Sequence, residues 1–120
     1  MLQQRFNLPN PWERMRRSQR LALSIPVVAY RYHKLGLPFS EGTRTLVVNA
    51  HGALISLTAQ VEVDQRLVLK HALSSEEQEC RIVFTEVKLT GPTEVGIEFH
   101  QPAPNFWGIA FPPADWILPR

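Results

Sequence analysis

The stretch from Thr43 to Leu57, TRTLVVNAHGALISL, decides how this chain folds. It holds two apolar runs, Leu46-Val47-Val48 and Ala53-Leu54-Ile55, on either side of the polar break Asn49-Ala50-His51-Gly52. Apolar runs around a short break containing Asn and Gly are typical of two paired strands and the turn that joins them. Gly52 suits a left-handed backbone, where a Cβ would cost about 1–2 kcal/mol. The stretch therefore predicts a β-hairpin.

Alternating apolar residues recur on both sides of this hairpin. The segment from Arg20 to Arg31 has apolar residues at alternate positions, which predicts a strand with one buried face, and Pro26 marks an edge or a bulge in it. The further predicted strands contain Val61, Val63, Leu67, Leu69, Cys80, Ile82, Phe84, Val95, Ile97, Phe99, Trp107, Ile109 and Phe111. The alternation changes phase after Phe84, which predicts a β-bulge near Thr85-Glu86.

Turn signals separate these runs. Gly and Pro residues predict a loop from Tyr32 to Gly42, and polar residues predict a turn from Ala72 to Gln78. Pro112-Pro113 ends the last run, and the next residues predict one helical turn anchored by Asp115 and Trp116. Short strands with turn signals about every 8–12 residues predict an all-β fold. We expect a small six- to seven-stranded antiparallel β-barrel with a short C-terminal helical turn.

Length and composition fit one packed domain. The chain has 120 residues, of which 44% are hydrophobic. We expect an N-terminal arm over residues 1–15 and a barrel domain over residues 16–120. No apolar run approaches the roughly 20 residues that span a bilayer, and the polar start lacks the apolar core of a secretory signal. A single Cys fits a reducing compartment. These features predict a cytoplasmic protein without membrane contact.

The charge of the chain is small but uneven. The net charge is +2, which argues against a general nucleic-acid binder. Arginines nevertheless gather in the run Arg16-Arg17-Ser18-Gln19-Arg20, directly before the first predicted strand. Such a run is either a solvated basic tail or an anion-binding segment anchored at the end of the sheet. The sequence leaves both interpretations open.

No pattern of catalytic or metal-binding residues is apparent. The four histidines and Cys80 lack metal-ligand spacings such as C-x-x-C or H-x-x-x-H. Cys80 alternates with apolar neighbours, which indicates a buried thiol rather than a nucleophile. The acidic cluster Glu76, Glu77 and Glu79 is typical of a solvated turn. We therefore expect no enzyme activity, no metal and no cofactor.

The order of these segments resembles the PilZ family of bacterial regulatory domains. It runs from RRSQR and LALSIPV (16–27) through TLVVNAHGALI (45–55) and TEVGIEF (93–99) to FWGIAFPPADW (106–116). The resemblance covers most of the chain. It implies a six-stranded antiparallel β-barrel followed by a helix. It also implies a non-catalytic regulatory domain that binds the second messenger cyclic di-GMP and relays the signal to a partner protein.

The resemblance assigns ligand-binding roles through two motifs. The first, RxxxR, matches Arg16 and Arg20, and an arginine presents a planar fork that fits phosphate or the guanine O6/N7 edge. The second, Asp/Asn-x-Ser-x-x-Gly, ends at Gly52 and has Asn49 at its serine position and Val47 at its first position. The implied ligand-binding residues are Arg16, Arg17, Arg20, Asn49 and Gly52.

Val47 keeps an alternative function open. A valine cannot hydrogen-bond guanine, and leaving a buried polar partner unsatisfied costs about 1–3 kcal/mol, or about tenfold to a hundredfold in affinity. The alternative is a protein-interaction module that has kept the barrel and lost cyclic di-GMP. A third interpretation is contact of the basic arm with RNA or DNA, which salt would weaken. The small net charge argues against this third interpretation.

Overall fold

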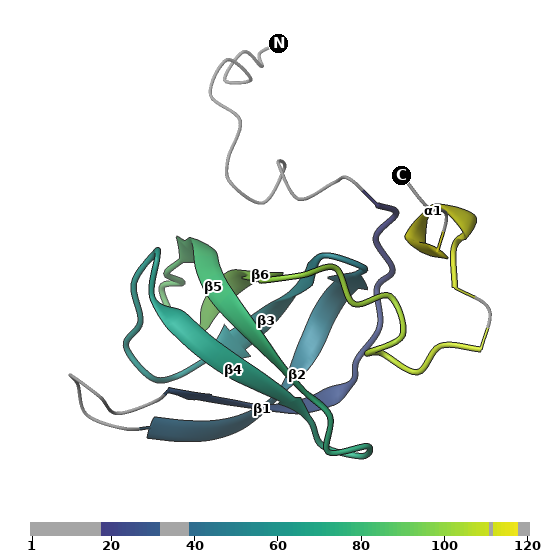
Figure 1. The fold of residues 1–120 in the computed structure, drawn as a ribbon. Coiled ribbons are helices and arrows are strands. Elements are labelled where there is room, and N and C mark those ends of the chain that lie inside the picture. Colours follow the sequence, from purple (N-terminus) through teal and green to yellow (C-terminus); the bar gives the residue numbers. More distant parts are fainter. Residues whose placement is uncertain (1–17, 32–38, 111, 118–120) are drawn as a thin grey trace, which may run out of the picture.

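The computed structural model describes residues 18–31, 39–110 and 112–117. Within them, six antiparallel strands close into a barrel and one short helix follows (Figure 1). The elements are β1 (Pro26–Arg31), β2 (Phe39–Asn49), β3 (Gly52–Leu57), β4 (Arg66–His71), β5 (Glu77–Glu86), β6 (Thr93–Phe99) and α1 (Ala114–Ile117). The barrel and the C-terminal helical turn that the sequence predicts are confirmed.

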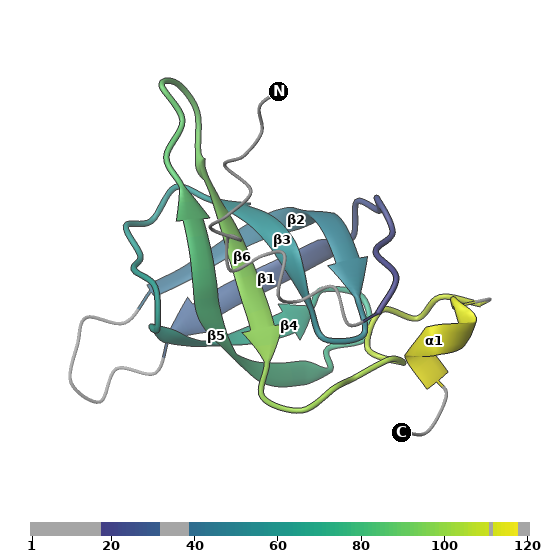
Figure 2. The same cartoon turned by 90° about the horizontal axis from the view of Figure 1, so that it is seen from above.

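The strands follow one another around the barrel in the order β1-β2-β3-β6-β5-β4, and β4 pairs with β1 to close it. Figure 2 shows the ring of strands from above. Closure gives each of the six described strands two neighbours, so none of them leaves an open edge on which another chain could add a strand. Among the described residues, no helix has both the length and the apolar character that crossing a membrane requires.

The barrel interior is filled by alternate residues of all six strands, as the period-two patterns predict. The buried strand residues of this core are Val27, Ala29, Val48, Ala53, Ile55, Leu57, Leu67, Leu69, Cys80, Ile82, Val95, Ile97 and Phe99. The turn before β4 contains Asp64 in a left-handed conformation (φ 77°). Val61 and Val63, which the sequence placed in a strand, precede Asp64 and belong to no strand.

Aromatic residues beyond β6 extend this core, where the sequence predicted another strand. Phe106 and Trp107 are both buried, with ring centroids 4.8 Å apart, and Trp107 also stacks on Phe99 at 5.7 Å. Residues 104–107 form a turn, and Gly108 follows with φ 69°. The predicted strand at Trp107 and Ile109 was therefore wrong, because these apolar residues pack against the core from a turn; Phe111 lies outside the described residues.

The β5 bulge lies earlier than predicted. The register of β5 against β6 shifts between Ile82 and Phe84, not near Thr85-Glu86. The shift places Phe84 in a second, small apolar cluster with Val83, Val47 and Leu54, apart from the main core. A second register shift, which the sequence did not indicate, lies in β2 between Thr45 and Val47.

The strand β5 ends at Glu86, and the apolar residues after it do not form a strand face. Val87 and Leu89 are 79% and 104% exposed in the loop between β5 and β6. Figure 2 shows this hairpin extending beyond the barrel wall. Gly91 turns the loop with φ 87°, a conformation that favours glycine.

The segment before β1 is only partly a strand. Continuous pairing begins at Pro26, and Leu21 forms an isolated bridge with Val48 through two hydrogen bonds of 2.8 Å. Pro26 thus stands at the first position of a strand, where its missing N–H costs least. The predicted 32–42 loop is wrong over residues 39–42, which belong to β2; residues 32–38 lie outside the described residues.

Glu41 in β2 fixes the loop that follows β3. Its carboxylate accepts hydrogen bonds from the Thr58 amide at 2.8 Å, the Thr58 hydroxyl at 3.0 Å and the Ala59 amide at 2.9 Å. Burial alone would raise the pKa of Glu41, but these hydrogen bonds to the charged form outweigh it and hold the pKa below its usual value. The loop therefore depends on an ionised Glu41.

We expect Glu41→Gln to destabilise the fold more at pH 7 than at pH 3. A lowered pKa contributes stability above the unfolded-state value of about 4.5, and that stability is lost as the pH falls through the folded-state value. Urea denaturation of both proteins at the two pH values measures the difference. An equal loss at both would show that the charge of Glu41 does not hold the loop.

Candidate functional site

Ser18 joins the segment before β1 to the turn between β2 and β3. We call residues 18–25 the lead-in segment. The Ser18 hydroxyl oxygen is buried, accepts a hydrogen bond from the Ala50 amide at 3.2 Å and lies 3.1 Å from His51 Nδ1. A hydroxyl can donate and accept at the same time, so this one side chain can bond both residues of the turn. The contact holds the lead-in segment on the turn.

Asn49 holds the same turn from inside. Its side chain is fully buried, its Oδ1 accepts a hydrogen bond from the His51 amide at 2.8 Å, and its Nδ2 donates to the Ser18 carbonyl at 3.4 Å. The Asn49 carbonyl accepts a further bond from Trp107 Nε1 at 2.9 Å. An Asn that bonds the backbone two residues on forms a turn without glycine-like dihedrals. In this conformation the carboxamide of Asn49 faces protein groups.

Gly52 does not adopt the left-handed backbone that the sequence suggested. It is the first residue of β3, it is buried, and it pairs with Asn49 on one side and Glu98 on the other. In the described residues, the glycines with positive φ are Gly91 and Gly108. The Asn49 side chain supports the turn instead.

The C-terminal helical turn holds the lead-in segment from the opposite side. The Asp115 carboxylate accepts two hydrogen bonds from the Gln19 amide, at 3.2 and 3.0 Å. Trp116 Nε1 donates to the Gln19 carbonyl at 2.6 Å. The peptide groups before and after Gln19 are thus both fixed by α1, by Asp115 at a sequence separation of 96 and by Trp116 at a separation of 97. The predicted anchoring role of Asp115 and Trp116 is confirmed.

The structure brings together some of the predicted site residues. Arg20 follows Gln19, which α1 holds, and precedes Leu21, which pairs with Val48. The described end of the arginine run therefore lies along the β2–β3 hairpin, which carries Asn49 and Gly52. Arg16 and Arg17 lie outside the described residues. Ligand binding by these residues stays a prediction.

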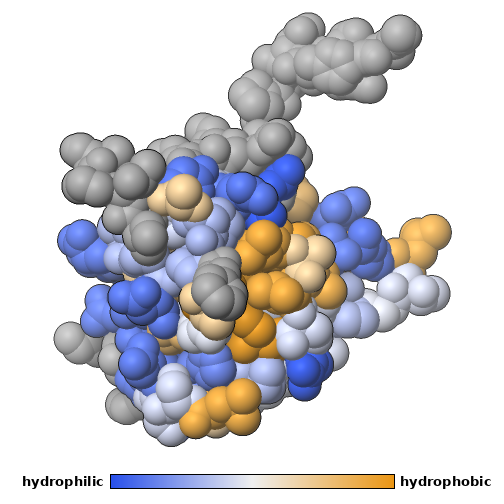
Figure 3. All heavy atoms as spheres, turned by 90° about the vertical axis from the view of Figure 1, so that its right-hand side faces the viewer, coloured by the Kyte–Doolittle hydropathy of each residue, from blue (hydrophilic) through white to orange (hydrophobic). Residues whose placement is uncertain are grey.

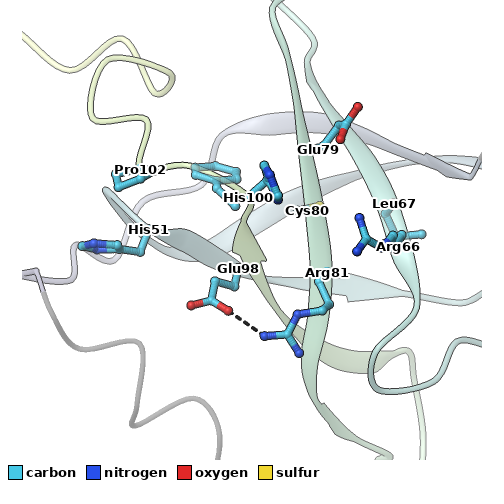
Figure 4. A pocket seen from close by; sticks show the side chains of 10 residues that line it. His51, Arg66, Leu67, Glu79, Cys80, Arg81, Glu98, His100 and Pro102 are labelled. Atoms are coloured by element: carbon cyan, nitrogen blue, oxygen red, sulfur yellow. Dashed lines mark hydrogen bonds and ion pairs between the residues drawn. The ribbon is translucent and has the colours of Figure 1, made fainter.

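A pocket beside the turn contains side chains that sequence reasoning missed. It has a volume of about 530 Å³ and lies between the turn, the strands β4, β5 and β6, and the segment after β6 (Figure 4). Its lining residues are His51, Arg66, Leu67, Glu79, Cys80, Arg81, Glu98, Phe99, His100 and Pro102. No local motif links these residues, because the strand register alone makes them neighbours.

Ion pairs fix one arginine of this pocket. Arg81 contacts Asp64 through one guanidinium nitrogen and Glu98 through the other, each at 2.9 Å. At the floor of the pocket, burial raises the pKa of the Cys80 thiol to about 12. The burial of Cys80 confirms the predicted buried thiol, and the raised pKa keeps it protonated at neutral pH. Across the described part of the chain, no three His, Cys, Asp or Glu residues gather as metal ligands would.

Known proteins add no information about this site. Comparison of the chain with models of protein families, with curated proteins and with solved structures gave no significant match. The resemblance to PilZ domains therefore stays a prediction from the residues and motifs quoted above.

We expect Asp115→Ala to free the lead-in segment without unfolding the barrel. The Gln19 amide loses its carboxylate acceptor, so its hydrogen exchange should accelerate and the unfolding free energy should fall by about 1 kcal/mol. Hydrogen exchange followed by NMR checks the first effect and urea denaturation the second. Glu76→Ala, which removes an exposed carboxylate from the β4–β5 turn, is the matched control. Unchanged exchange at Gln19 would contradict the role of Asp115.

Proposed function

We propose that this chain is a cytoplasmic, non-catalytic bacterial regulatory domain that binds cyclic di-GMP and relays the signal to a partner protein. One observation carries the proposal. The buried Ser18 contact with Ala50 and His51 brings the end of the arginine run onto the turn that contains the second PilZ-like motif. These two segments lie more than 30 positions apart in the sequence, and the resemblance requires them to meet.

The arginines would supply most of the binding energy. Arginine is always charged and meets phosphate with two parallel N–H donors. By the resemblance, Arg16, Arg17 and Arg20 would close over a ligand that lies against the barrel near Gly52. The lead-in segment is already fixed at Ser18 and Gln19, so less of the chain has to be ordered when the ligand binds.

The lead-in segment also offers a route for the signal. Its backbone is bonded to the β2–β3 turn at Ser18 and to α1 at Gln19. A ligand that shifts the arginine run would therefore change the position or the stability of α1. A partner protein could recognise that altered surface, which is the population shift that differential binding produces.

We expect titration calorimetry to detect cyclic di-GMP binding at about 100 μM ligand, together with a rise in thermal stability. Arg20→Ala should weaken binding about tenfold or more, because it removes a charged bidentate donor. Lys88→Ala removes the same charge from the β5–β6 loop and should leave the affinity unchanged. Absence of both heat and thermal shift with the unaltered protein would refute the proposal.

The alternative function is a protein-interaction module that has lost cyclic di-GMP. It is favoured by the packing of Val47 against Leu54, Val83 and Phe84 and by the complete burial of Asn49, because both motif positions then serve the fold. Figure 3 shows apolar side chains gathered in one area on the side of the molecule that faces right in Figure 1. Such an area is a frequent feature of interaction surfaces.

This alternative predicts a gain of function. The unaltered protein would show no cyclic di-GMP binding, and Val47→Asp combined with Asn49→Ser, which rebuilds the second motif, would create it. The same calorimetric titration compares the double variant with Val47→Asp alone, which keeps the Asn49 bonds to Ser18 and His51. Micromolar binding by the unaltered protein would exclude the alternative.

A further inference from the structure

The strand register places three charged residues, Glu98, Arg81 and Arg66, in a row that starts from Gly52. Gly52 pairs with Glu98, Glu98 with Arg81, and Arg81 with Arg66, so the row crosses β3, β6, β5 and β4. The row begins at the turn that holds Ser18 and ends at the far wall of the 530 Å³ pocket. The candidate turn and the pocket are therefore parts of one continuous surface.

The two arginines of this row differ in their partners. They stand directly opposite each other on β4 and β5, where like charges repel. Arg81 is neutralised by Asp64 and Glu98, whereas Arg66 is exposed and forms no ion pair with any residue that the structure describes. The remaining acid of the pocket, Glu79, points away from both guanidinium groups in Figure 4. An anion beside Arg66 would give this guanidinium the direct partner that Arg81 has in Asp64 and Glu98.

The rest of the pocket suits the planar part of a nucleotide. Leu67, Cys80 and Phe99, all buried, form an apolar floor. Two flat or rigid side chains, His100 and Pro102, stand with His51 on the side of the β2–β3 turn (Figure 4). A pocket of this size with an apolar floor and a few charged side chains on its wall is typical of small-molecule sites.

We propose that this pocket holds one nucleotide half of the cyclic dinucleotide, and that Arg66 is the residue of the barrel that binds its phosphate. The inference rests on the proposed function and adds a site that neither motif contains. In this proposal the barrel contacts the ligand through β4 and β5 instead of β2. Val47 and Asn49 on β2 are then not needed for binding and can serve the packing of the fold. The guanidinium of Arg66 can bind a phosphate bidentately.

Two probes, cyclic di-GMP and GMP, test the proposal by titration calorimetry on the full chain. Arg66→Ala should weaken the binding of both probes about tenfold or more. Lys88→Ala, with the same loss of charge, should weaken neither. Because Arg66 is exposed and faces a like charge, its removal should leave the denaturation midpoint unchanged or raise it, which separates lost binding from lost folding.

The outcomes separate this inference from the proposed function. Cyclic di-GMP binding that Arg66→Ala leaves unchanged overturns the assignment of Arg66 and keeps the proposed function. GMP binding that depends on Arg66, without any binding of cyclic di-GMP, supports the pocket and overturns the proposed function. Equal weakening by Arg66→Ala and Lys88→Ala shows only a general charge effect and overturns the assignment. Failure of both probes to bind overturns both proposals.

Discussion

The backbone of Ser18 and Gln19 is held between two elements that lie far apart in the sequence. The β2–β3 turn bonds Ser18 through Asn49 and Ala50, and α1 bonds both peptide groups of Gln19. After Gln19, the lead-in segment is held by the bridge of Leu21 with Val48 and by hydrogen bonds with Thr45 and Arg44 of β2, and its apolar residues pack against the core. The position of Arg20 beside the hairpin depends on this double attachment.

This attachment also explains why a four-residue helix can persist at the C-terminus. A helix of one turn is unstable alone, because nucleation fixes several residues for a single hydrogen bond. Trp116 is buried against the main core and bonds the Gln19 carbonyl, so packing supplies the stability that the helix itself lacks. The lead-in segment and α1 therefore stabilise each other. A change in the position of one should alter the position or the stability of the other.

The sequence predicted the barrel well because burial on a closed sheet alternates with a period of two. The prediction failed where apolar residues have another reason to be there. Phe106 and Trp107 are apolar because they pack on the core from a turn, and in sequence they look like the start of a strand. The run Ile82-Val83-Phe84 is apolar on both faces, since Ile82 faces the core while Val83 and Phe84 belong to the outer cluster. When apolar residues do not alternate with polar ones, the sequence does not show which of them face the core. The position of the bulge was therefore predicted wrongly.

The candidate site likewise has one part that the sequence predicted and one part that it did not. The turn at Asn49 and the end of the arginine run are local in sequence and could be found there. Arg66, Arg81 and Glu98 become neighbours only through the register of three strands, which a single sequence does not reveal. Asn49 shows a second limit, because an amide that binds a ligand and an amide that closes a turn are the same residue type with the same donors and acceptors.

Val47 connects the packing of the barrel to the selectivity of the proposed ligand site. Val47 is half-buried against Val83, and its side chain has no group that could accept a hydrogen bond from the N–H groups of a guanine. Phosphate contacts from arginines add affinity but carry little information about the base, whereas hydrogen bonds to the base edge discriminate. A site whose barrel contacts come from Arg66 instead of position 47 would therefore keep much of its affinity for a cyclic dinucleotide. It would distinguish guanine from other bases less sharply than a site with both complete motifs.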